Sequence, residues 1–173
     1  MAAYRIDAFG ELLLAHLETG SRVLEIGCGA GELATMLVRR GLDVVAIDRA
    51  PRDEFPAIAA SLESYETPKA FDGVIAMLVL HHVDDLEGAI GKIASLLKPA
   101  GLVAIDDYGW ERREASTPQA RAWRDDRREL HTSAMMLESL DRAFTRLHYT
   151  DHAYFDEGVG DDRLGFTYLG RRR

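Results

Sequence analysis

The sequence has a single cysteine and no long uninterrupted run of apolar residues. Because Cys28 is the only cysteine among 173 residues, no disulfide can form within the chain, which fits the reducing cytoplasm. No apolar run approaches the roughly 20 residues that a membrane-spanning helix needs, and the N-terminus lacks the pattern of a signal peptide. We therefore expect a cytoplasmic protein with no membrane partner.

Positive charge is also scarce. The chain has 21 Lys and Arg against 29 Asp and Glu, which gives a formal net charge of -8 at pH 7. Surfaces that bind nucleic acid need clustered basic residues, so we expect no nucleic-acid partner. Acidic neighbours nearly balance the arginines of residues 112–128, which indicates a solvated, salt-bridged face. Residues 171–173, all arginine, are expected to form a frayed, solvated tail.

The length and the alternation of elements indicate one α/β domain that covers residues 1–173. The chain is long enough for a substantial core, and its hydrophobic content is 47%, as in an ordinary globular protein. Short apolar runs alternate with stretches of helical periodicity, and no linker or repeat interrupts them. This alternation predicts a doubly wound, mainly parallel sheet.

The stretch Val-Leu-Glu-Ile-Gly-Cys-Gly-Ala-Gly, residues 23–31, organises the rest of the chain. It begins as a buried strand and is stopped by three glycines at every second position. Residues 32–40 then take up helical periodicity and end at Gly41. Glycine lets the backbone turn with positive φ and lets a ligand approach closely, while the free N–H groups of the helix start favour an electron-rich group. Cys28 has no adjacent base, so it is a packing residue rather than a nucleophile.

Two acidic residues flank this turn. Glu25 lies two residues before the first glycine, at the end of the strand, where a buried carboxylate is costly unless a positively charged group pairs with it. A second strand, residues 43–47, ends in Asp48, the position of a ribose hydroxyl acceptor. A dinucleotide site of the GxGxxG type would need glycine where Glu32 stands, so a nicotinamide-dependent oxidoreductase is disfavoured.

The remaining elements are predicted from periodicity and breakers. They are a leading amphipathic helix within residues 1–20, a third strand at residues 56–60 reached through a proline-rich crossover without a helix, a fourth strand at residues 71–78, a helix that begins at Asp84 or Asp85, a fifth strand at residues 102–106, a helical stretch at residues 134–143, and two strands at residues 144–150 and 164–170 that form a hairpin.

Several motifs together resemble the class I S-adenosylmethionine-dependent methyltransferases. They are the E-x-G-x-G-x-G turn, the acid at Asp48, and the segments FDGVI, LHHV and LKPAG, which extend the resemblance over residues 23–104. The resemblance implies a Rossmann-like seven-stranded sheet of order 3-2-1-4-5-7-6, with strand seven antiparallel and helices on both faces. It also implies in-line methyl transfer from S-adenosylmethionine to a small-molecule acceptor, which leaves S-adenosylhomocysteine. The alternative is a protein of this fold that binds the cofactor without methyl transfer.

The resemblance also implies roles for individual residues. Glu25 would hold the cofactor ammonium, and Asp48 would bind the ribose hydroxyls. The backbone of the turn would lie beside the methionine part at Gly27, Cys28, Gly29 and Ala30, and Arg49 would flank the adenine. Ser61 and Leu62 stand at the place where many relatives bond the adenine amino group. Met77 and Leu78 end the strand that would face the sulfonium.

Methyl transfer from a sulfonium needs alignment more than it needs a base, because the leaving group is already activated. His81, His82 and His131 are nevertheless candidate bases, although loop histidines of this family often do structural work. Adjacent histidines point in different directions and no third ligand has suitable spacing, so we expect no metal. The leading helix is a packing element or a lid, and residues 108–143, which include Tyr108, Trp110 and Trp123, are expected to line a pocket for a small, largely apolar or aromatic acceptor. The sequence does not indicate an oligomeric state.

Overall fold

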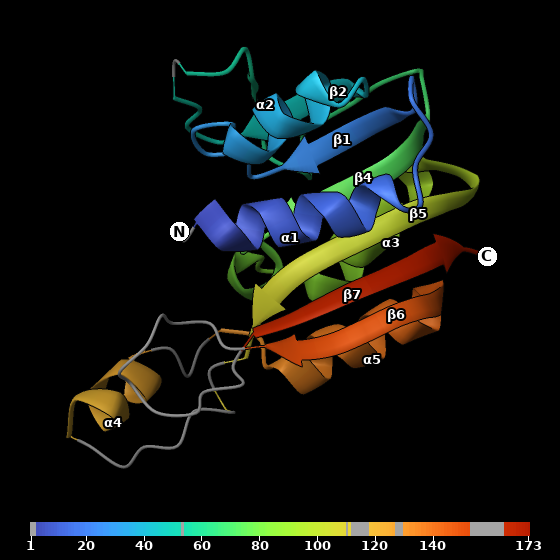
Figure 1. The fold of residues 1–173 in the computed structure, drawn as a ribbon. Coiled ribbons are helices and arrows are strands. Elements are labelled where there is room, and N and C mark those ends of the chain that lie inside the picture. The colour runs from blue at the N-terminus through green and yellow to red at the C-terminus, as the bar shows by residue number, and fades with distance from the viewer. Residues whose placement is uncertain (1–2, 53, 110, 112–117, 127–129, 153–164) are drawn as a thin grey trace.

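The computed structural model describes residues 3–52, 54–109, 111, 118–126, 130–152 and 165–173. Its centre is a seven-stranded sheet of order β3-β2-β1-β4-β5-β7-β6 (Figure 1). Neighbouring strands are parallel except that β7 runs antiparallel to both β5 and β6. The predicted fold class and strand order are therefore confirmed. The strands are β1 Arg22–Ile26, β2 Asp43–Asp48, β3 Ile58–Ala59, β4 Phe71–Met77, β5 Leu97–Tyr108, β6 Phe144–His152 and β7 Gly165–Arg172.

Helices cover both faces of the sheet. They are α1 Ala3–Leu14, α2 Glu32–Arg39, α3 Leu86–Leu96, α4 Pro118–Asp125, α5 Ser133–Ala143 and a 3₁₀ turn, η1 Leu80–His82. Figure 1 shows α1 and α2 in front of the sheet and α3 and α5 behind it. Alternate strand residues point to opposite faces, so Val23 packs in the α1–α2 core while its neighbour Leu24 packs in the α3–α5 core. No described helix is long and apolar enough to cross a membrane.

The edge of the sheet at β3 is thin. Within the described residues, neither the crossover from β2 to β3 nor that from β3 to β4 contains an α-helix, and β3 has only 2 residues, fewer than the predicted residues 56–60. The side chains of Leu62 and Tyr65, which are 4% and 7% exposed, fill the core at this place. Ile58 on β3 is 48% exposed.

The fifth strand is longer than residues 102–106. It begins at Leu97, directly after α3, and reaches Tyr108. Its pairing with β4 slips between Phe71 and Gly73 because residues 98–101 bulge outward, with Ala100 at a φ of 58°. From Leu102 onward the pairing with β4 is regular to Asp106.

The expectation of a frayed tail at residues 171–173 is wrong. Arg171 and Arg172 belong to β7, and their guanidinium groups donate to the carbonyls of Ala100 and Leu97 at the bulge that opens β5. Arg173 donates to the carbonyls of Asp141 and Arg142, both at 2.9 Å. The three arginines therefore fasten the C-terminus to carbonyl groups far away in sequence.

We predict that Tyr65→Ala destabilises the fold strongly. Tyr65 is buried where a crossover helix would otherwise cover the sheet, so its removal leaves a cavity in the core. The free energy of unfolding in urea should fall by about 3–5 kcal/mol. Ile58→Ala is the matched control on the same edge, and its effect should stay within about 0.5 kcal/mol because Ile58 is exposed. Equal losses in the two variants would contradict this account of the edge.

Candidate functional site

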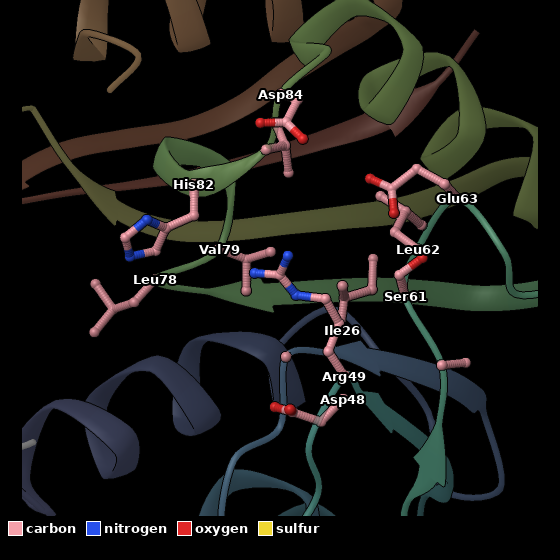
Figure 2. A pocket seen from close by; sticks show the side chains of 13 residues that line it. Ile26, Asp48, Arg49, Ser61, Leu62, Glu63, Leu78, Val79, His82 and Asp84 are labelled. Atoms are coloured by element: carbon pink, nitrogen blue, oxygen red, sulfur yellow. The ribbon is translucent and has the colours of Figure 1, made fainter. Parts of the chain in front are cut away.

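A pocket of about 420 Å³ lies where β1, β2 and β4 end (Figure 2). This is the point at which the strand order reverses direction, and ligands of open α/β sheets bind at such points. The pocket is lined by the glycine turn, the end of β2, the segment after β3 and the loop after β4. The lining residues are Ile26, Gly27, Asp48, Arg49, Ala60, Ser61, Leu62, Glu63, Leu78, Val79, His82, Val83 and Asp84.

The glycine turn after β1 is left-handed at each of its three glycines. The φ angles of Gly27, Gly29 and Gly31 are 70°, 54° and 76°. A Cβ built on Gly27 would lie 2.5 Å from Cγ2 of Val79, and one on Gly31 would lie 2.2 Å from Cβ of Phe55, whereas one on Gly29 would meet nothing within 4 Å. Two glycines therefore permit close packing, and the backbone of Gly29 faces open space.

The carboxylate of Asp48 joins the end of β2 to this turn. Its Oδ2 accepts a hydrogen bond from the Gly29 amide at 2.9 Å, and its Oδ1 accepts one from the Ala50 amide at 2.8 Å. Each carboxylate oxygen can accept a further hydrogen bond. Asp48 also lines the pocket, so it can bind a pair of ligand hydroxyls while it supports the turn.

Glu25 is a buried acid with an incompletely satisfied carboxyl group. It is 4% exposed, and its Oε2 has no hydrogen-bond partner among the residues that the structure describes. Burial raises its pKa to about 8, the Ala34 amide partly opposes this rise, and the charge of Asp48 adds to it. A buried polar group without a partner costs free energy. A positively charged ligand group next to the glycine turn would remove that cost.

Beyond Arg49, the far side of the pocket holds Ser61 and Leu62, as the resemblance implies, and a third residue, Glu63. The pKa of Glu63 is lowered by hydrogen bonds from its own backbone amide and from the Ser61 hydroxyl, and the charge of Arg49 lowers it further. Figure 2 shows Glu63 beside Ser61 and Leu62. The resemblance implies the adenine contact at Ser61 and Leu62 and gives Glu63 no role. The signal that could have found it is an acid two residues further on.

The structure separates the three candidate histidines. His82 lines the pocket. His81 is buried, with Nδ1 at 2.5 Å from Oδ1 of Asp107. His131 lies outside the pocket wall, and its Nε2 donates to the carbonyl of Val83 at 2.7 Å. The pocket therefore receives His82, while His81 and His131 support the chain segment that carries it.

Other predicted site residues lie next to the pocket rather than in its wall. Met77 is 7% exposed and packs in the core, whereas the following Leu78 lines the pocket. Cys28, Gly29 and Ala30 do not line it either. Burial raises the pKa of the Cys28 thiol to about 11, so this cysteine is unreactive at neutral pH. Within the described part of the chain, no group of His, Cys, Asp and Glu is arranged to hold a metal ion.

Comparison with protein families agrees with this geometry. Residues 1–153 match the model of a family described as a methyltransferase domain. The chain belongs to this family.

This methyltransferase domain also has named relatives. It is 41% identical over 101 residues to a ubiquinone biosynthesis O-methyltransferase of Xanthomonas campestris pv. campestris (strain B100), an alignment that covers 50% of this chain and 42% of the relative. A second such protein, of Chromobacterium violaceum, is 37% identical over 99 residues, or 49% of this chain and 43% of the relative. The chain spans less than half the length of these relatives.

Solved structures share the fold of this methyltransferase domain. The N-methyltransferase NodS of Bradyrhizobium japonicum WM9 in complex with S-adenosyl-L-homocysteine has a TM-score of 0.75 at 19% identity, over 98% of this chain and 86% of that one. A 1,6-didemethyltoxoflavin-N1-methyltransferase of Burkholderia thailandensis has a TM-score of 0.73 at 19% identity, over 96% of this chain and 77% of that one. At these identities the likeness concerns the fold.

We predict that Glu25→Gln changes how stability depends on pH. The folded pKa of Glu25, about 8, exceeds its ordinary value of 4.5, so its stabilising contribution is complete below about pH 4.5 and is lost as the pH rises through 8. Glutamine has no charge to lose. We therefore expect the free energy of unfolding in urea of the variant, minus that of wild type, to rise by roughly 3–5 kcal/mol between pH 5 and pH 9. Each pKa unit corresponds to about 1.4 kcal/mol. A parallel pH dependence in both proteins would contradict the assignment.

Proposed function

We propose that this methyltransferase domain binds S-adenosylmethionine and transfers its methyl group to a small-molecule acceptor. The observation that supports this most is the carboxylate of Asp48 in the pocket wall, with two features of neighbouring residues behind it: the open backbone at Gly29 and the buried oxygen of Glu25 that has no partner among the described residues. A cofactor with an ammonium group, a ribose and an adenine supplies the groups that these residues lack. The O-methyltransferase names of the sequence relatives favour an acceptor hydroxyl.

The residues present fit this cofactor. The carboxylate of Glu25 would pair with the ammonium, the backbone of residues 27–30 would lie along the methionine part, and Asp48 would accept from the ribose hydroxyls. Ser61, Leu62 and the Glu63 carboxylate would bind the adenine, with Arg49 at its flank, and Met77 and Leu78 would lie near the sulfonium. Asp48, Glu63 and Asp84 outnumber Arg49 in the pocket wall, and this negative balance suits a cationic ligand.

The bound cofactor would supply a methyl group on an already activated sulfonium. The tasks left to the chain are to align the acceptor with it, to exclude water and to accept a proton where the acceptor loses one. We assign the last task to His82, because it is the candidate histidine that lines the pocket. Figure 2 shows His82 and Leu78 on one side of the pocket, with Ser61, Leu62 and Glu63 on the other. His82 thus lies away from the proposed adenine end.

The acceptor would enter between this side of the pocket and the segments that follow β5. Tyr108 is 6% exposed and its ring lies 4.3 Å from that of His81, while His131 reaches back to the pocket wall through Val83. Trp110 and the side chain of Trp123 lie outside the described residues.

Arg5 of α1 pairs with Asp106 at the end of β5, which brings the leading helix to this edge. A lid role for the leading helix and for residues 108–131 stays a prediction.

We predict that Asp48→Asn weakens the binding of S-adenosylhomocysteine. Asparagine offers one acceptor oxygen in place of two, and the hydrogen bonds lose their charge. In isothermal titration calorimetry the binding free energy should fall by about 1.5–3 kcal/mol. Asp43→Asn is the matched control, since Asp43 begins the same strand and pairs with Arg22 on the surface, away from the pocket. Unchanged affinity of a folded Asp48→Asn variant would show that the ribose is bound elsewhere.

We predict that His82→Gln lowers turnover more than it lowers cofactor affinity. Wild type and variant would be incubated with radiolabelled S-adenosylmethionine and a panel of small phenols, amines and thiols. With a phenol acceptor, loss of the base should reduce kcat by roughly 10²–10⁴-fold, while S-adenosylhomocysteine still binds. Wild type that binds the cofactor but labels no member of the panel would favour the alternative, a cofactor-binding protein without methyl transfer. Equal turnover by both proteins would exclude His82 as the base.

A further inference from the structure

The carboxylate of Asp107 is enclosed by hydrogen-bond donors. Asp107 lies near the end of β5 and is 0% exposed. Its Oδ2 accepts from the backbone amides of Val79 at 3.2 Å and Leu80 at 2.8 Å. Its Oδ1 accepts from its neighbour's amide, that of Tyr108, at 2.8 Å and lies 2.5 Å from Nδ1 of His81. Three of these four donors belong to the loop that follows β4.

That loop begins with a residue in an unfavourable conformation. Leu78 has a φ of 60°, one of two positive values among the described residues other than glycine. A side chain with a Cβ adopts the left-handed region only where the surroundings enforce it. Here both sides of the strained residue are fixed by β5: the Leu78 amide donates to the Asp106 carbonyl at 2.8 Å, and the next two amides donate to the Asp107 carboxylate.

The strained turn directs two side chains into the pocket. Leu78 and Val79 both line it (Figure 2). Cγ2 of Val79 lies so close to the glycine turn that a Cβ on Gly27 would be 2.5 Å from it. A change in the conformation of Leu78 would therefore move the pocket wall and its contact with the glycine turn together.

We propose that Asp107 is a positioning residue for methyl transfer: it holds Leu78 in the left-handed conformation and so sets the pocket wall that faces the methyl group of the cofactor. This inference rests on the proposed function. Asp107 does not line the pocket, and it acts through Leu78 and Val79. A carboxylate suits the task because it only accepts hydrogen bonds, and every group around it is a donor or can become one.

The test uses S-adenosylmethionine labelled with ¹³C in its methyl group, bound to wild type and to Asp107→Asn. Asparagine has one acceptor oxygen and must turn an NH₂ group toward at least one of the surrounding donors, so the loop should lose its fixed geometry. The bound methyl resonance should shift or broaden, while the dissociation constant from calorimetry changes less than about threefold, because the proposed nucleoside contacts remain. Asp72→Asn is the matched control. Asp72 also accepts from a backbone amide, that of Arg22 at 2.9 Å, but it stands near the other end of β4, and its loss should leave the resonance in place.

A double-mutant cycle tests the mechanical link without any ligand. Glycine adopts a φ of 60° without strain, so Leu78→Gly removes the strain against which the Asp107 carboxylate holds the loop. In wild type, Asp107→Asn lets Leu78 relax, and the strain that is released offsets part of the loss. Asp107→Asn should therefore lower Tm more in the Leu78→Gly background, where no strain is left to release. If the single variant does not fold, adding Leu78→Gly should restore folding, because the strain is then absent. Additive effects on Tm would overturn the inference, as would a methyl resonance that is identical in wild type and folded Asp107→Asn. Wild type without any bound methyl resonance would overturn the proposed function itself.

Discussion

Two adjacent buried acids at the end of β5, Asp106 and Asp107, connect this strand to several segments that are distant in sequence. Neighbouring residues of a strand face opposite sides of the sheet. Asp106 therefore binds Arg5 of α1, His152 of β6 and Thr167 of β7 on one side, while Asp107 binds the loop after β4 on the other. Burial alone would raise the pKa of Asp106, but the hydrogen bond from His152 and the charge of Arg5 bring it below its ordinary value. A buried charge without its partners is strongly destabilising, so both acids require several distant segments to arrive in place.

Two unfavourable local features lie at or beside the pocket. Glu25 has a buried oxygen without a partner in the described part of the chain, and Leu78 has a left-handed backbone. By contrast, the central strands β4 and β5 contain unbroken runs of buried apolar residues, among them Val74, Ile75 and Ala76. This division is expected where a rigid scaffold offsets the cost of a site arranged for a ligand.

The apolar runs and the glycine turn are local signals, so the doubly wound sheet and the place of the pocket could be predicted from them, whereas the strand order was implied by the resemblance to class I methyltransferases. The sequence could not predict which of two adjacent histidines faces the pocket. That choice depends on η1, whose geometry is fixed by Asp107, 26 positions away from His81. The arginines at the C-terminus looked like a tail because their partners, the carbonyls of Leu97, Ala100, Asp141 and Arg142, are remote in sequence. Glu63 was missed because a two-residue strand leaves little pattern from which to set its register.

Because β3 is short, few hydrogen bonds hold it to the rest of the sheet. Two paired residues join β3 to β2, with one further hydrogen bond from the Ala60 amide to the Asp48 carbonyl at 3.0 Å. Breaking so few bonds costs far less than opening the opposite end of the site, where buried acids tie α1, β6, β7 and the loop after β4 to β5. The two ends of the pocket thus differ in compliance. At the proposed nucleoside end few hydrogen bonds hold the pocket wall, so we expect spent cofactor to leave there without disturbing the wall at the proposed acceptor end.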